Sequence, residues 1–312
     1  MKIGVILHGQ LRTGLSCAKY IKELFDDYDA DFFIHLWDVS TTKWLDDKIY
    51  TNPTYTDKVI PIPAGEKHTN DYYHTWDEFN KIKEIYKPKY FSTSRKDDDY
   101  NLARENLTKE DEVGVMGYYS ALKALFGLSM YQSETKTKYD LVIRMRPDAI
   151  VPKSEIRGFK NAISRIKKNK KTFFCEYQVT PSNNLVNFPI IDYYQIGNYN
   201  NMVELHKWVY EREFGIDTNL QTVINNLIDS NQLILGRSQF KTLIIRNIMD
   251  DEAYIKLLYE IWDENDKNGM DIYQHMVTYM NPSRVREYYG EHVDEPLTKE
   301  KIINNVIKLY SK

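Results

Sequence analysis

Three short stretches of the sequence place charged, imidazole or indole side chains directly after apolar runs. They are residues 8–12 (HGQLR), residues 35–38 (HLWD) and residues 146–148 (RPD). Guanidinium groups bind phosphate through paired hydrogen bonds, and carboxylates bind divalent cations or accept protons. The residue types therefore predict an anion-binding or metal-assisted site.

The third stretch ends the apolar run at residues 139–151, which also contains Arg144. Side chains alternate along a strand, so Arg144, Arg146 and Asp148 project to one side if the strand persists that far. Arg144 has two explanations: an internal ion pair with Asp148 or Asp38, or a bound phosphate. Pro147 ends the strand and places Arg146 and Asp148 at its tip, which favours a binding role for both.

The elements that carry these stretches predict a parallel sheet. A β-branched run at residues 2–8, helical spacing at residues 16–25 and a buried run at residues 30–38 form the start of a βαβ unit. In such a sheet, ligands bind outside the carboxyl ends of the strands. The three polar stretches all lie there, so we expect their side chains to converge.

The remaining chain continues the alternation of strands and helices. Helices are predicted at residues 76–86, 113–131, 154–171 and 202–213, strands at residues 89–93, 172–179 and 191–198, and a loop at residues 40–64. We expect an α/β fold, with a Rossmann-like, mostly parallel central sheet flanked by helices, over residues 1–214. Residues 215–312 are predicted to be a mostly helical extension packed on it. The amphipathic segment at residues 299–312 could touch a membrane, but its acidic neighbours favour packing on the protein's own core.

Composition excludes several classes of function. The 312 residues are 42% hydrophobic and 13% aromatic, as expected of a globular protein with a sizeable core. A formal net charge of −3 argues against nucleic-acid binding. The only cysteines, Cys17 and Cys175, imply no disulfide framework and favour a reducing compartment. With no leader and no apolar run of membrane-spanning length, we expect a cytoplasmic location and no integral membrane segment.

Several motifs occur in an order that resembles one enzyme family. They are HGQLRTG, DFFIHLWD, IYKPKYF, GYYSALKALFGL leading into YDLVIRMRPD, and DYYQIGNYNNM. Together they are similar to nucleotide-sugar-dependent glycosyltransferases with a GT-A-like fold, of the kind found in bacterial and viral polysaccharide-building clusters. The similarity ends near Phe214. It implies transfer of a sugar from a nucleoside-diphosphate sugar to a glycan or another hydroxyl acceptor.

The resemblance also implies which residues hold the donor. They are His8, Gly9, Gln10, Arg12, Trp37, Asp38, Tyr119, Lys123, Arg144 and Arg146. Gly9 lets the backbone approach the nucleotide, and the cations face the charge that develops on the leaving diphosphate. Trp37 either stacks on a base or sugar ring or only packs in the core. Of the adjacent Tyr118 and Tyr119, one is expected to face the core and the other the donor pocket.

Metal dependence is left open by the sequence. GT-A enzymes typically hold a divalent metal with an Asp-x-Asp signature, and here that position reads Arg146-Pro147-Asp148, with one carboxylate. Either Asp148, water and phosphate oxygens complete a Mg²⁺ or Mn²⁺ shell, or cationic side chains replace the ion. His8 and His35 lack a third ligand at fixed spacing, so they are interpreted as core histidines rather than a zinc site.

The acceptor side is predicted at Asp192. Its carboxylate would hydrogen-bond a sugar hydroxyl or act as the catalytic base that an inverting transferase requires. Asp192 as a turn residue is an equal alternative.

Two other classes of function compete with glycosyl transfer. A sulfotransferase or kinase-like transferase would use HGQLRTG as its phosphate loop, but the Gly-Lys-Ser/Thr ending is missing. A non-catalytic carbohydrate- or nucleotide-binding protein would explain the single aspartate. The anion-site hypothesis needs open strand ends, and it would be contradicted by Asp148 locked against Arg146 with no cavity beside them.

Overall fold

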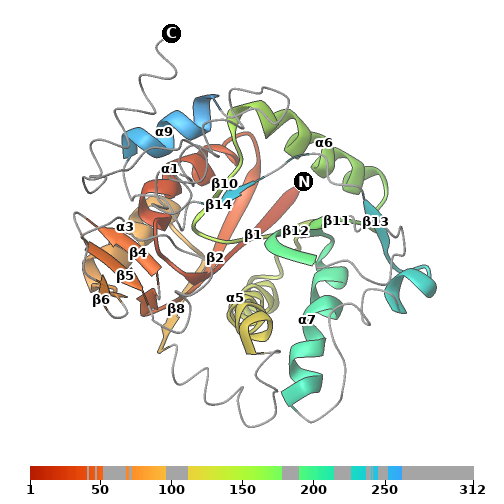
Figure 1. The fold of residues 1–312 in the computed structure, drawn as a ribbon. Helices are drawn as coiled ribbons and strands as arrows, with labels where there is room; N and C mark the ends of the chain where they lie inside the picture. The colour runs from red at the N-terminus through yellow and green to blue at the C-terminus, as the bar shows by residue number, and fades with distance from the viewer. Residues whose placement is uncertain are drawn as a thin grey trace, which may run out of the picture.

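A seven-stranded sheet forms the centre of the molecule (Figure 1). The computed structural model describes residues 1–40, 42–45, 48–51, 68–69, 72–95, 112–177, 190–213, 226–236, 240, 242–244 and 252–261. The strand order is β13-β11-β12-β9-β1-β2-β8. The bounds are Lys2–Gln10 (β1), Asp29–Trp37 (β2), Tyr90–Ser94 (β8), Leu141–Met145 (β9), Thr172–Tyr177 (β11), Ile190–Gly197 (β12) and Ile234–Gly236 (β13). Within this sheet β12 runs antiparallel to both its neighbours, and the other pairs are parallel.

Helices cover both faces of this sheet (Figure 1). They are α1 (Gly14–Glu23), α3 (Trp76–Tyr86), α5 (Glu112–Thr135), α6 (Ile156–Lys168), α7 (Tyr199–Glu213) and α9 (Glu252–Ile261), with a short 3₁₀ helix η1 (Lys153–Glu155) before α6. Alternate β1 residues serve the two layers: Ile3, Val5 and Leu7 pack with α1, α3 and α6, whereas Ile6 packs with α5 and α7. All five residues of β9 are buried, as expected of a strand covered on both faces. The predicted α/β fold, mostly parallel and flanked by helices, is confirmed.

Two predicted segments differ from the structure. The stretch expected to be a loop contains β3 (Val39–Ser40), β4 (Thr42–Leu45) and β5 (Lys48–Thr51), which pair in small sheets with β7 (Tyr72–Tyr73) and β6 (His68–Thr69). Beyond residue 214, β13 joins the central sheet, and β14 (Leu243–Ile244) pairs with β10 (Ala149–Ile150). Strands of two to four residues are too short to produce a readable period of alternation.

The predicted domain boundary after residue 214 stays a prediction. The amphipathic segment at residues 299–312 lies outside the described residues. Within the described part of the chain, no helix combines the length and the hydrophobicity needed to cross a membrane.

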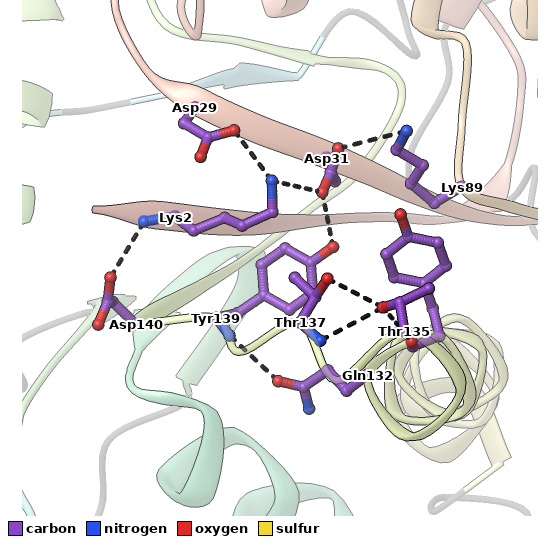
Figure 2. Close-up of polar contacts among 10 residues, drawn as sticks. Lys2, Asp29, Asp31, Lys89, Gln132, Thr135, Thr137, Tyr139 and Asp140 are labelled. Atoms are coloured by element: carbon purple, nitrogen blue, oxygen red, sulfur yellow. Dashed lines mark hydrogen bonds and ion pairs between the residues drawn. The ribbon is translucent and has the colours of Figure 1, made fainter.

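The amino-terminal ends of the central strands are joined by paired charges (Figure 2). Lys2 Nζ lies 3.0 Å from Asp29 Oδ1 and 3.0 Å from Asp31 Oδ2. The Tyr139 hydroxyl donates to Asp31 Oδ2 at 2.7 Å, and the backbone N–H of Lys2 donates to the Asp140 carboxylate at 3.0 Å. These contacts tie the start of β1 to the start of β2 and to the segment before β9.

Candidate functional site

The strand order reverses between β1 and β9. From β1 the chain moves outward to β2 and β8, and then returns to the other side of β1 as β9. In open α/β sheets the ligand crevice lies outside the carboxyl ends of the strands at such a switch point. Residues 9–12, at the end of β1, and residues 146–148, directly after β9, therefore lie where such a sheet binds its ligand.

Two arginines converge on one aspartate at this point, as the strand-end rule predicts. Arg146 donates to Asp148 through Nε (2.9 Å, to Oδ1) and Nη2 (2.8 Å, to Oδ2). Arg12 donates from Nη1 to Asp148 Oδ2 at 3.0 Å. The Asp148 side chain is fully buried, whereas each arginine side chain is 11% exposed. Burial alone would raise the pKa of Asp148, but the two guanidinium groups outweigh it and lower the pKa to about 2.

This arrangement does not fit a divalent cation at Asp148. Both carboxylate oxygens already accept hydrogen bonds from guanidinium groups, and a metal would have to displace Arg12 or Arg146. Nowhere in the described residues do three or more His, Cys, Asp or Glu side chains gather to hold a metal ion. Asp148 is thus locked against Arg146, contrary to the expectation of an open carboxylate, and this meets the first of the two conditions that would contradict the anion-site hypothesis. Because Asp148 is closed off, any contact with an anion is left to the two arginine side chains that it positions, each 11% exposed.

The turn between β1 and α1 is built for close approach to β9. Gly9 has φ +97 and Arg12 has φ 44, both in the left-handed region that favours glycine. The Arg12 backbone N–H donates to Ser40 Oγ at 2.9 Å, which holds the turn in this conformation. A Cβ on Gly14 would lie 3.0 Å from Pro147 Cβ, so the start of α1 touches the end of β9. The loop geometry thereby brings Arg12 to Asp148.

Ser120 of α5 connects β1 with β2 and was not singled out from the sequence. Its Oγ accepts from the Gly9 N–H at 2.8 Å and lies 2.7 Å from His35 Nδ1. The other ring nitrogen of His35 lies 3.0 Å from Ser94 Oγ. His35 is a core histidine with both nitrogens bonded, as expected. The signal for Ser120 was a polar residue inside the apolar motif GYYSALKALFGL.

A cavity of about 370 Å³ lies between α5 and the edge strand β8. Its lining includes Tyr90, Ser92, Thr93, Tyr119, Lys123 and Phe126, with His35 at the β2 side. Lys123 Nζ lies 5.0 Å from the centre of the Tyr119 ring, a cation–π distance. Tyr118 is buried, and Tyr119 lines the cavity. Arg12, Arg146 and Asp148 do not line this cavity, so they form a separate group, and Ser120 links the Gly9 turn of that group to the helix that lines the cavity.

A third group of predicted residues lies deeper, beneath the switch point. Arg144 is fully buried, its Nε donates to His8 Nε2 at 2.9 Å, and its guanidinium carbon lies 4.0 Å from the centre of the Tyr118 ring. The expected ion pair with Asp148 or Asp38 is therefore wrong. The pairing of β1 with β9 decides the partner: Arg144 is level with Ile6, and His8 follows on the same face.

Gln195 of β12 and His206 of α7 also belong to this deep group, and the sequence did not single them out. Gln195 of β12 lies opposite Arg144, and its Nε2 donates to the Tyr118 hydroxyl at 2.8 Å. The His206 ring of α7 lies 5.6 Å from the Tyr118 ring, and its Nδ1 donates to the Met202 carbonyl at 2.7 Å. Burial, and secondarily Arg144, lower the pKa of His206 to about 3 and that of His8 well below its ordinary value.

The remaining predicted residues occupy the rim. Trp37, at the end of β2, is 5% exposed, which favours packing over stacking on a ligand. Asp38 follows it, and its backbone bonds Ser94 and His74. Gln10 ends β1 in a half-buried position. Asp192 lies near the start of β12. Because β12 and β9 are antiparallel, the start of β12 lies at the edge of the sheet where β9 ends. The side chain of Asp192 is not among those that the structure describes.

Comparisons with known proteins yield structural likenesses only. No protein-family model and no curated protein matches the chain. Among solved structures, 4-diphosphocytidyl-2C-methyl-D-erythritol synthase from Anaerococcus prevotii is 10% identical over 82% of this chain and 98% of its own, with a TM-score of 0.36. Galactosyltransferase LgtC, in complex with donor and acceptor sugar analogs, is 10% identical over 76% of this chain and 74% of its own (TM-score 0.32).

A third similar structure is the inositol-1-phosphate CTP transferase from T. maritima. It is 11% identical over 82% of this chain and 93% of its own, with a TM-score of 0.37. At such TM-scores these likenesses assign neither a fold nor a reaction. The fold is described from the chain's own strand order.

Proposed function

We propose that the chain is a glycosyltransferase that moves a sugar from a nucleoside-diphosphate sugar to a hydroxyl acceptor such as a glycan. The observation that carries the proposal is the convergence of Arg12 and Arg146 on one buried carboxylate at the switch point between β1 and β9. The cluster brings two guanidinium groups to one carboxylate. It stands where the fold class binds phosphate-bearing ligands.

The reaction requires positive charge close to the diphosphate. Breaking the bond between the sugar and the phosphate leaves a nucleoside diphosphate with growing negative charge, and cations aimed there beforehand lower the barrier. Arg12 and Arg146 supply that charge, and Asp148 fixes their direction through three hydrogen bonds. Guanidinium groups, rather than Mn²⁺ or Mg²⁺ on Asp148, are therefore proposed to stabilise the leaving group.

The cavity beside α5 suits the nucleoside half of the donor. Its walls combine aromatic rings with the hydroxyls of Ser92 and Thr93, which match the flat face of a base and the hydroxyls of a ribose. Lys123 adds a cation at the side of Tyr119. On the other side of β9, Asp192 stays the proposed acceptor residue, either as the catalytic base or as a hydrogen-bond partner of the acceptor hydroxyl.

Calorimetry with nucleotide sugars tests the proposal. We expect UDP- or GDP-sugars to bind in EDTA as well as in Mn²⁺, and Arg12→Gln to weaken binding about ten- to a hundredfold, because a charge-assisted contact is lost. Arg12→Gln leaves both Arg146–Asp148 hydrogen bonds in place. Arg157→Gln makes the same chemical change on the exposed side of α6 and is expected to bind like the unaltered protein.

Product analysis then identifies the reaction. Release of a nucleoside diphosphate together with a glycosylated acceptor is expected. Release of pyrophosphate from a nucleoside triphosphate would instead indicate nucleotidyl transfer, and absence of any binding would reject the donor site. Binding that needs Mn²⁺ would overturn the assignment of charge neutralisation to the arginines.

A further inference from the structure

Arg144 is the largest fully buried side chain among the described residues and carries a charge that no described carboxylate balances. Only its Nε is bonded, to His8, while both amino groups, Nη1 and Nη2, are buried without a hydrogen-bond partner. A guanidinium stays protonated in any protein environment. Its contact with the Tyr118 ring offsets part of the loss of water, but a ring face provides no acceptor for four N–H bonds.

The atoms around Arg144 share this lack of partners. His8 accepts from Arg144 at Nε2, so its proton sits on Nδ1, and that nitrogen is buried and unbonded. His206 donates from Nδ1 to Met202, which leaves Nε2 as an unbonded acceptor. Gln195 donates to Tyr118 and keeps an unbonded carbonyl oxygen. The group thus presents unused donors from Arg144 and His8 and unused acceptors from Gln195 and His206.

Both histidines are neutral, so the group has one net positive charge. Burial and the neighbouring guanidinium keep the pKa of His8 and His206 low. A water molecule could satisfy individual donors and acceptors here, but it would leave the charge of Arg144 unbalanced. Proteins rarely keep an isolated buried charge, because solvation lost on burial must be replaced by a counter-charge. A bound anion would supply that counter-charge.

We propose that Arg144 and His8 bind an oxyanion that carries neighbouring hydroxyl groups, at a site distinct from the Arg12–Asp148–Arg146 cluster. The oxyanion accepts hydrogen bonds from the N–H groups of Arg144 and from the Nδ1–H of His8. Hydroxyls beside it donate to Gln195 Oε1 and His206 Nε2. This chemistry is found in a sugar phosphate and in a sugar acid, and the experiment separates the two sources.

The test uses glucose 1-phosphate, glucuronate and uncharged glucose as probes in thermal-shift and calorimetric titrations of the full chain. We expect at least one of the two anions, and not glucose, to raise the Tm and bind. Stabilisation by glucose 1-phosphate alone assigns the site to a phosphate, and stabilisation by glucuronate alone assigns it to a sugar carboxylate. If neither anion binds, the proposal is overturned.

Replacement of Arg144 is expected to affect stability and anion affinity in different directions. Arg144→Met removes a buried unbalanced charge at similar volume, so the Tm without ligand should stay level or rise, while anion affinity falls at least about tenfold. A lower Tm with unchanged anion affinity would show that Arg144 is structural and overturn the proposal. Arg157→Met is the matched control, and His8→Gln, which keeps an amide N–H near the same place, is expected to retain partial binding. These anion titrations stand apart from the nucleotide-sugar test with Arg12→Gln, so either proposal can fail alone.

Discussion

At the scale of single residues, the convergence of Arg12, Arg146 and Asp148 followed from their types and their places after predicted strands. The partner of Arg144 could not be predicted in the same way. It depends on which residue of β1 lies level with Arg144, and the pairing with Ile6 sets His8, not an aspartate, beside the guanidinium. The register between two parallel strands cannot be predicted from a single sequence, because buried parallel strands are apolar on both faces and no pattern fixes which residues lie side by side.

The buried histidines predict how stability depends on pH. The pKa of His206 is about 3 in the folded protein, against an ordinary value of 6.5 in the unfolded chain. Between these values the unfolded chain binds a proton that the folded protein does not. This contribution to stability is therefore fully present above pH 6.5 and is lost as the pH is lowered toward 3, by at most about 1.4 kcal/mol per pH unit for each such histidine.

Urea unfolding between pH 7.5 and pH 4.5 measures this fall. We expect His206→Gln to make it shallower, because one of the two titrations, that of His206, disappears while that of His8 remains. Arg157→Gln should leave the slope unchanged. Equal slopes in the unaltered protein and His206→Gln would contradict the assignment of a neutral, buried His206.

At the scale of elements, long periodic segments were predictable and short ones were not. The helix at residues 76–86 was predicted with the bounds of α3, which begins with a capping box between Thr75 and Glu78 and ends at left-handed Lys87. The strands β4 and β5, of four residues each, carry no comparable start or stop signal. Tertiary pairing, rather than local preference, determines them.

The packing of α1 on the end of β9 gives a prediction at this scale. An alanine Cβ at Gly14 would lie 2.7 Å from Leu11 Cδ1, 3.0 Å from Pro147 Cβ and 3.3 Å from the Pro147 carbonyl oxygen. We expect Gly14→Ala to lower the free energy of unfolding by about 1–3 kcal/mol through overpacking. It should also weaken nucleotide-sugar binding, because the turn that carries Arg12 is pushed away from Asp148.

Chemical denaturation together with calorimetry checks both effects. Lys19→Ala, on the exposed side of the same helix, is expected to change stability by no more than about 0.5 kcal/mol and to leave affinity unchanged. A Gly14→Ala protein with full stability and full affinity would show that α1 can shift without consequence for the site.

At the scale of the whole molecule, the two edges of the sheet have different charge arrangements. The amino-terminal edge in Figure 2 pairs Lys2 with Asp29 and Asp31, and Asp31 also accepts the Tyr139 hydroxyl. At the carboxyl-terminal edge Arg12 and Arg146 converge on Asp148, and Arg144 lies beneath them against the neutral His8. The net charge of −3 could not predict this difference between the two edges, because a net charge gives no information about where the charged residues lie.

Because the two edges are separate, we expect a substitution at the amino-terminal edge to change stability without changing nucleotide-sugar affinity. Asp31→Ala removes the acceptor of the Tyr139 hydroxyl and one partner of Lys2, and we expect it to lower the free energy of unfolding by about 1–3 kcal/mol. Nucleotide-sugar affinity should stay within twofold of the unaltered protein, because the carboxyl-terminal edge is untouched. Calorimetry on the folded variant decides; a large loss of affinity would mean that the binding site lies elsewhere.

The position of Ser120 has a mechanical consequence. Its hydroxyl holds the Gly9 amide and the His35 ring at once, while Tyr119 before it and Lys123 one turn later line the cavity. We expect a molecule that displaces this turn of α5 to lengthen the Ser120–Gly9 hydrogen bond, which anchors the loop that carries Arg12. Occupation of the cavity would then change the direction of the Arg12 side chain.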